Sequence, residues 1–159
     1  MLFRSCQIPI HILDIEAATD SVIAEVMDYW CGLNDGLPPA RKAFEFMAVY
    51  KAAPHLLMAE RIAPAMFRFI YCGTFVAENF PLDLTGKTFA PDTMKVSGVN
   101  WPSFFTDALD TPCLRYGREN LDWPNDEYGQ ITYGVCPLTD DGNRPAFALA
   151  CLTFVKKSP

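Results

Sequence analysis

The chain has little of what a nucleic-acid-binding or membrane-spanning protein needs. Its 159 residues include 13 basic and 19 acidic side chains, for a formal net charge of −6, whereas binding to phosphates requires a basic surface. The close basic pairs, Arg41-Lys42 and Lys156-Lys157, are interpreted as solvated surface pairs. No apolar run approaches the roughly 20 residues that cross a bilayer. We therefore expect neither nucleic acid nor membrane as a partner.

The N-terminus lacks the pattern of a signal peptide. Its apolar stretch after Met1 is soon interrupted by His11, Asp14 and Glu16, whereas a secretory signal needs an unbroken apolar segment. The sequence therefore predicts a cytoplasmic protein. Six cysteines are scattered without a CxxC pair. Because buried thiols behave as small hydrophobic groups and cytosolic proteins rarely hold disulfides, we expect free, structural cysteines.

Motifs of catalysis and metal binding are also missing. The sequence has no P-loop, no glycine-rich dinucleotide fingerprint and no Ser, His and Asp in a triad order. Gly86-Lys87-Thr88 has the ending of a phosphate loop without its upstream glycine. The two histidines and six cysteines show no zinc-ligand spacing. We expect no catalytic residue, no metal and no cofactor, haem and flavin included, and we do not expect an enzyme.

What the chain does have is enough apolar sequence for one domain with a core, since 50% of its residues are apolar and 13% aromatic. The clearest local pattern is a C-terminal hairpin, with strands over 129–138 and 146–155 and a turn at Asp140-Asp141-Gly142-Asn143. If Cys136 lies opposite Ala146, one face of this hairpin is shallow and suits the close approach of a helix. That face would carry Thr132, Gly134, Cys136, Ala146, Ala148 and Ala150.

The remaining elements are predicted from periodicity and capping residues. A helix over 21–31 is capped by Thr19 or Asp20. We further predict a helix over 43–50, strands over 55–60, 66–76 and 115–123, a helical turn over 75–80 and a partly helical segment over 94–110. The fold class is therefore α+β, with an antiparallel sheet of about five strands. Residues 1–18 are predicted to be an N-terminal extension and residues 19–156 a single domain.

A series of short motifs follows in order along the chain. The motifs are Tyr29-Trp30, Leu37-Pro38-Pro39-Ala40-Arg41, Ala53-Pro54-His55-Leu56-Leu57-Met58, Phe67-Arg68-Phe69, Cys72-Gly73-Thr74, Glu78, Asp83-Leu84-Thr85-Gly86-Lys87 and Pro137-Leu138-Thr139-Asp140-Asp141-Gly142. This series resembles the single-domain PAS-like family of bacterial sensor and regulatory proteins. The resemblance spans residues 21–155. One departure is Ala43-Phe44-Glu45-Phe46, which lacks the proline that family members tend to carry there.

The resemblance implies a five-stranded antiparallel sheet with helices packed on one face. It also implies signal sensing or regulation, through a ligand or a protein contact and without catalytic residues. Because no output domain is visible, the signal would pass to another polypeptide. We expect the helix over 21–31 to pack across the shallow face of the hairpin, in its own subunit or in a partner of a homodimer.

The ligand-binding candidates are an aromatic set and one arginine, and each has a structural alternative. They are Phe69, Tyr71, Trp101, Phe105, Tyr133 and Arg68. The aromatic residues could line an apolar pocket or simply form the core. Arg68 could receive a carboxylate, or lay its stem on the sheet with its head in water. Arg115 and Arg118 are interpreted as members of surface ion pairs.

Two other functions stay open. The chain could be an enzyme or carrier on a cone-like α+β fold that binds a small molecule in the aromatic cavity, which would need a polar pair such as His55 with an acid. It could also be a structural interaction module with no cavity. His55 itself could be a haem ligand, but we favour a histidine bonded to the backbone at a strand edge.

Overall fold

The computed structural model describes residues 6–81, 83–90 and 101–158. The strands of this part of the chain are β1 (Ile10–Ile12), β2 (Leu56–Ala63), β3 (Met66–Cys72), β4 (Thr88–Phe89), β5 (Leu114–Asn120), β6 (Tyr128–Thr139) and β7 (Pro145–Lys156). The helices are α1 (Ile15–Thr19), α2 (Ser21–Leu33), α3 (Thr74–Asn79) and α4 (Trp101–Asp110). The α+β class is as predicted.

The described strands form one seven-stranded sheet in the order β1-β5-β6-β7-β2-β3-β4. Every neighbouring pair from β5 to β4 is antiparallel, whereas β1 runs parallel to β5. The sheet is therefore mixed, and the prediction of about five antiparallel strands was too simple. The two added edge strands have three and two residues, too few to show an alternating pattern in the sequence. β1 and α1 both come from the segment that we predicted to be an N-terminal extension.

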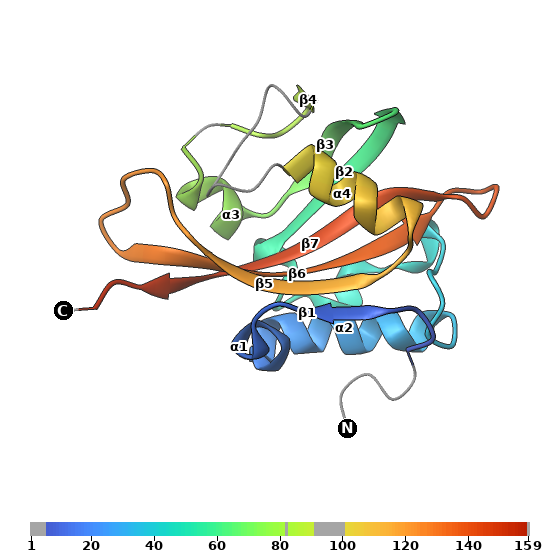
Figure 1. Cartoon of the computed structure of the whole chain (residues 1–159), viewed down its shortest axis with the longest axis horizontal. Coiled ribbons are helices and arrows are strands. Elements are labelled where there is room, and N and C mark those ends of the chain that lie inside the picture. The colour runs from blue at the N-terminus through green and yellow to red at the C-terminus, as the bar shows by residue number, and fades with distance from the viewer. Residues whose placement is uncertain (1–5, 82, 91–100, 159) are drawn as a thin grey trace.

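Helices cover both faces of the sheet, so the prediction of helices on one face was wrong. Figure 1 shows α1 and α2 on one side of the strands and α3 and α4 on the other. The physical reason lies in the central strands, because β6 is buried continuously from Ile131 to Thr139. A strand that is apolar on both faces needs a cover on each.

α2 packs on the sheet of its own chain, as the sequence allowed. Asp20 caps the helix by accepting hydrogen bonds from the backbone N–H groups of Val22 and Ile23 at 3.0 and 3.1 Å. Gly134 makes close contact possible, because a Cβ there would lie 2.6 Å from Ile23 Cγ2 and 3.2 Å from Met27 Cε. The helix ends two residues later than expected, at Leu33, before a turn in which Asp35 and Gly36 have positive φ.

The C-terminal hairpin forms, but in a different register from the one supposed. Cys136 pairs with Leu149, not with Ala146. This shift of three residues exchanges the faces of β7, since side chains alternate along a strand. Alanines 148 and 150 therefore lie on the α4 face, and Leu149 and Cys151 share the α2 face with Gly134. The register shift of one residue between Leu138 and Thr139, at the start of the turn, makes the total displacement odd and so exchanges the faces.

Other elements differ in length or type. The helix predicted over 43–50 is replaced by short 3-10 turns at Arg41–Ala43 and Phe46–Val49. The strand predicted over 66–76 ends at Cys72, and α3 follows it as the predicted helical turn. α4 accounts for the second part of the segment predicted over 94–110, and residues 94–100 lie outside the described residues.

Candidate functional site

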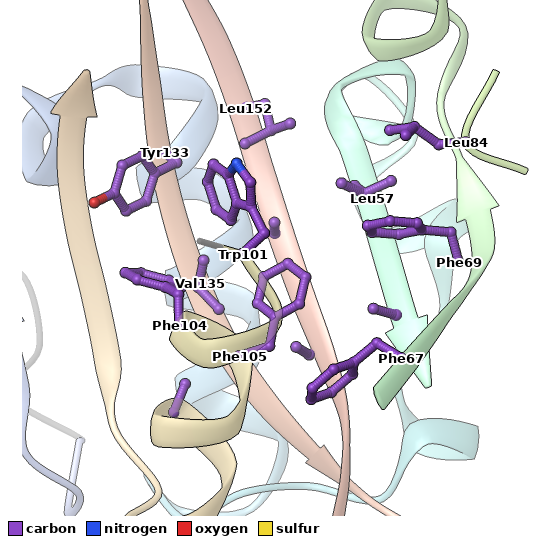
Figure 2. Close-up of a cluster of buried hydrophobic side chains, with 14 of the residues drawn as sticks. Leu57, Phe67, Phe69, Leu84, Trp101, Phe104, Phe105, Tyr133, Val135 and Leu152 are labelled. Carbon is purple, nitrogen blue, oxygen red and sulfur yellow. The ribbon is translucent and has the colours of Figure 1, made fainter. Parts of the chain in front are cut away.

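Four of the six predicted binding residues meet between the sheet and α4. Phe69 comes from β3, Tyr133 from β6, and Trp101 and Phe105 from α4; together with Phe67 and Phe104 we call them the aromatic cluster (Figure 2). Pairing within the sheet brings β3 and β6 under the same helix. Trp101, Phe104 and Phe105 share one side of α4 because residues three and four apart lie on the same helix face.

The rings of the aromatic cluster pack directly against one another. The ring centroids of Trp101 and Tyr133 are 5.3 Å apart, those of Trp101 and Phe105 5.6 Å, and those of Phe69 and Phe105 6.4 Å. These distances are typical of edge-to-face and tilted packing. None of these four side chains is more than 3% exposed. A ligand among these rings would have to displace them.

Tyr133 has a second role within this cluster. Its ring extends across Gly117 of β5, where a Cβ would collide with the phenol group. Figure 2 shows the Tyr133 hydroxyl directed toward that strand. Burial raises the pKa of Tyr133 to about 12, with a smaller increase from Glu119 and an opposing effect of Arg115. The phenol is therefore held neutral in the folded protein.

Tyr71 lies on the other face of the sheet, away from the aromatic cluster. A register shift in the β2–β3 pair leaves Ile70 without a partner between Phe69 and Tyr71. This β-bulge reverses the alternation, so that Tyr71 packs on Phe46, with ring centroids 4.5 Å apart, and donates a hydrogen bond to the Ala53 carbonyl. The expected alignment of Phe67, Phe69 and Tyr71 on one face was wrong for this reason.

Arg68 is a surface residue of the sheet and not part of a ligand site, which was the structural alternative given for it. Its Nη2 lies 2.6 Å from Glu60 Oε1 on the neighbouring strand, and its side chain is about half exposed. His55 also follows its structural alternative, since its Nδ1 lies 2.9 Å from the Leu152 carbonyl oxygen. Its ring stacks at 4.4 Å from that of Phe75. Neither residue borders the aromatic cluster.

A cleft next to the aromatic cluster gathers charged and polar groups that the sequence did not bring together. We call it the rim cleft; its volume is about 340 Å³ and it is lined by His11, Asp107, Asp110, Thr111, Cys113 and Arg115. α4 supplies the two aspartates, and the adjacent strands β1 and β5 supply the two bases. The parallel register places His11 beside Arg115. This volume lies at the small end of the range of ligand sites.

Arg115 connects the rim cleft to the aromatic cluster. Its guanidinium carbon lies 4.2 Å above the ring centroid of Phe104, a cation–π contact. Sequence reasoning grouped Arg115 with Arg118 as surface ion-pair residues. The structure separates them, because Arg118 lies 2.6 Å from Glu16 while Arg115 faces α4. The missed signal was the i and i+2 spacing with Cys113, which places Arg115 on the strand face that packs against the helix.

A wider groove of about 650 Å³ lies beside the rim cleft, but its charges are already paired. It runs between the β2–β3 turn and the β6–β7 turn. Arg61 meets Asp110 at 2.5 Å and donates to the Pro145 carbonyl, and Arg144 lies 3.5 Å from Asp140. Asp140 also accepts hydrogen bonds from the backbone N–H groups of Arg144 and Gly142. Both bonds lower the pKa of Asp140, and the bond from Arg144 has the greater effect. This groove therefore offers a ligand few unpaired groups.

Two further properties of the described residues bear on the site. No group of three or more His, Cys, Asp or Glu side chains there is arranged to hold a metal ion. No helix of this part of the chain combines the length and apolar character needed to cross a membrane. The cysteines at 6, 31, 72, 113, 136 and 151 are all free thiols, as expected.

Comparison with known proteins gives no family. No protein-family model and no curated protein matches this chain. Among solved structures, a crystal structure of an IcIR transcriptional regulator from Alicyclobacillus acidocaldarius is similar with a TM-score of 0.35 and 12% identity over 89% of this chain. This chain spans 60% of that regulator's length. A likeness of this size supports no conclusion about function.

Proposed function

We propose that this protein is a PAS-like sensory or regulatory domain that works by binding a small molecule, a partner protein, or both. It performs no catalysis, and its response reaches another polypeptide. The proposal combines the motif series in the sequence with the architecture around α4. A cytoplasmic location is part of this proposal.

The observation that carries the proposal is the arrangement of the five central strands. In the order β3-β2-β7-β6-β5 they are antiparallel throughout, and this pairing supports the proposal although the whole described sheet is mixed. β1 and β4 then extend this unit at its two edges. The aromatic cluster lies on one face of these strands under α4, next to the rim cleft.

α4 is the element best placed to respond to binding. It has ten residues and contacts the sheet through Trp101, Phe104 and Phe105, whose rings meet their neighbours edge-on. Edge-on ring contacts depend on the relative position of the rings, and a small gap already forfeits part of their dispersion energy. In this proposal a molecule bound beside α4 changes these contacts, and a partner recognises the altered surface of the helix.

The alternative of an enzyme or carrier has less support. It needs a polar pair inside the aromatic cavity, such as His55 with an acid, and His55 instead meets a backbone carbonyl, beside the ring of Phe75. General acid–base chemistry needs two such groups within reach of a substrate. A binding role needs no polar pair beyond the side chains that the structure already places around α4.

The expected homodimer is retained as a proposal with a changed interface. The apolar side of α2 is occupied by its own sheet, since Ile23, Val26 and Met27 are fully buried. Exposed apolar side chains remain next to α1, where Leu13 and Ile15 are 63% and 65% exposed. Native mass spectrometry would give the oligomeric state, and a dimer that persists after Leu13→Ser and Ile15→Ser would exclude this surface.

Hydrogen–deuterium exchange tests the regulatory function. The full chain is incubated with fractions of a cytoplasmic metabolite extract, and exchange is followed for each peptide. We expect at least one fraction to slow exchange in α4 and in the strands beneath it. If no fraction changes exchange anywhere, or if a fraction is chemically converted by the protein, the proposal fails.

A further inference from the structure

We propose that the rim cleft binds a small zwitterion that carries both a carboxylate and an ammonium group, as a free α-amino acid does. This inference deepens the proposed sensory function and rests on it for its biological purpose. The binding itself follows from the side chains that line the cleft.

Among the arginines of the described chain, Arg115 and the exposed Arg41 form no ion pair, and of these two only Arg115 lines the rim cleft. Arg61, Arg68, Arg118 and Arg144 each lie 3.5 Å or less from a carboxylate oxygen. Arg115 forms no ion pair with a described residue, and its Nε is buried without a hydrogen-bond partner. A buried polar group without a partner is destabilising, so a site of this kind favours a ligand that supplies the acceptor.

The guanidinium of Arg115 is also held ready for a planar anion. The cation–π contact with Phe104, 4.2 Å from the guanidinium carbon to the ring centroid, restrains the group, and a guanidinium fork matches a carboxylate with two parallel hydrogen bonds. His11 lies beside it on β1 and lines the same cleft. Bases from two adjacent strands therefore occupy the sheet side of the rim cleft.

The helix side of the rim cleft carries the opposite charge. Asp107 is exposed and forms no ion pair within the described part of the chain, whereas Asp110 is engaged by Arg61. Asp107 and Arg115 line one cleft without pairing with each other. A ligand with a single negative charge would meet repulsion from these aspartates. A ligand with both charges would satisfy Arg115 at one end and Asp107 at the other.

Calorimetric titration of the full chain with each common α-amino acid tests the proposal. For the tightest binder, the matched des-amino acid and the matched amine are titrated in parallel. We expect each matched compound to bind about tenfold to hundredfold more weakly, which is the value of one charge-assisted interaction. Failure of every amino acid to bind, or equal binding of the des-amino acid, would overturn the inference.

Variants locate the binding in the rim cleft. Arg115→Gln and Asp107→Asn should each weaken amino-acid binding about tenfold or more. Asp107→Asn should strengthen binding of the des-amino acid, because it removes a like charge from the cleft. Arg41→Gln and Asp126→Asn are the matched controls, since both residues are exposed and lie outside the cleft. If Arg115→Gln does not fold, Arg115→Lys replaces it, keeping the charge without the planar fork. Unchanged binding in a folded Arg115 variant would refute the site.

Hydrogen–deuterium exchange separates this inference from the proposed function. If another metabolite protects α4 and amino acids do not bind, the ligand class is wrong and the sensory role stands. If an amino acid binds and α4 exchange is unchanged, the site is correct and the sensory role fails.

Discussion

The two faces of the sheet are covered by helices that are attached in different ways. On one face α2 is fixed at both ends by directional bonds: Thr153 Oγ1 donates to Asp20 Oδ2 at 3.1 Å, and Trp30 Nε1 donates to the Pro137 carbonyl at 2.8 Å. On the other face α4 rests on aromatic rings and borders a cleft with unpaired charges. We infer that the α2 face maintains the fold and that the α4 face is the one free to respond.

The largest expected effect concerns the packing of the α4 face. Phe105 is 1% exposed and lies among Phe67, Phe69 and Trp101. Phe105→Ala should lower the free energy of unfolding by about 3–5 kcal/mol, measured by urea denaturation. Met47→Ala, at a side chain that is 79% exposed, serves as the control and should change it by less than about 0.5 kcal/mol. A small loss at Phe105 would mean that the aromatic cluster has unfilled room, contrary to our description.

The next effect concerns the closeness of α2 to its strand. Gly134→Ala introduces a Cβ at 2.6 Å from Ile23 Cγ2, and such overpacking should lower the free energy of unfolding by about 1–3 kcal/mol. Gly129→Ala on the same strand is the matched control, because its Cβ would meet only Lys157 Cγ at an ordinary 3.5 Å. Equal stability of the two variants would show that α2 can shift on its face, and the contrast between the faces would be lost.

A smaller effect should follow from releasing one end of α2. Asp20→Ala removes the helix cap and the bond to Thr153, so unfolding should become easier by about 1–2 kcal/mol. Asp28→Ala, at an exposed position of the same helix, should have almost no effect on stability. Hydrogen exchange should increase in the first turn of α2 in the Asp20 variant alone. The same increase in both variants would argue against a specific anchor.

The smallest effect depends on pH and tests the burial of Tyr133. Its folded pKa of about 12 exceeds the ordinary tyrosine value of about 10, so the folded state retains a proton that the unfolded state loses. The associated stability is complete below pH 10 and is lost as the pH rises toward 12. Unfolding of the native chain and of Tyr133→Phe should be compared over this range. We expect a shallower decline in the variant, and identical slopes would contradict the burial of the phenol.

Much of the local structure could be predicted from the sequence, and what failed had a common cause. The capped helix at Ser21, the terminal hairpin and the packing of α2 near Gly134 were recognised from contiguous patterns. The face of the sheet on which each side chain lies was not predicted correctly, because one unpaired residue in a strand reverses the alternation of the residues that follow it. The bulge at Ile70 and the shift at Thr139 each changed which side chains meet.

The candidate site was predictable to a lesser extent for a related reason. Phe69, Trp101, Phe105 and Tyr133 were grouped correctly because buried aromatic residues of a small domain gather in its core. The rim cleft joins His11 to Arg115 through the parallel pairing of β1 with β5. No local pattern predicts contact between two segments about a hundred residues apart. The rim cleft could therefore be recognised only from the structure.

The short outer strands have a consequence for how copies of this molecule behave in crowded solution. β1 and β4, which border the sheet, offer only three and two residues for pairing. Long unpaired borders are the templates on which β-rich proteins recruit one another into fibrils. The strands β2, β6 and β7 have a neighbour on each side, so the backbone of the longest apolar strands is withheld from other copies of the molecule.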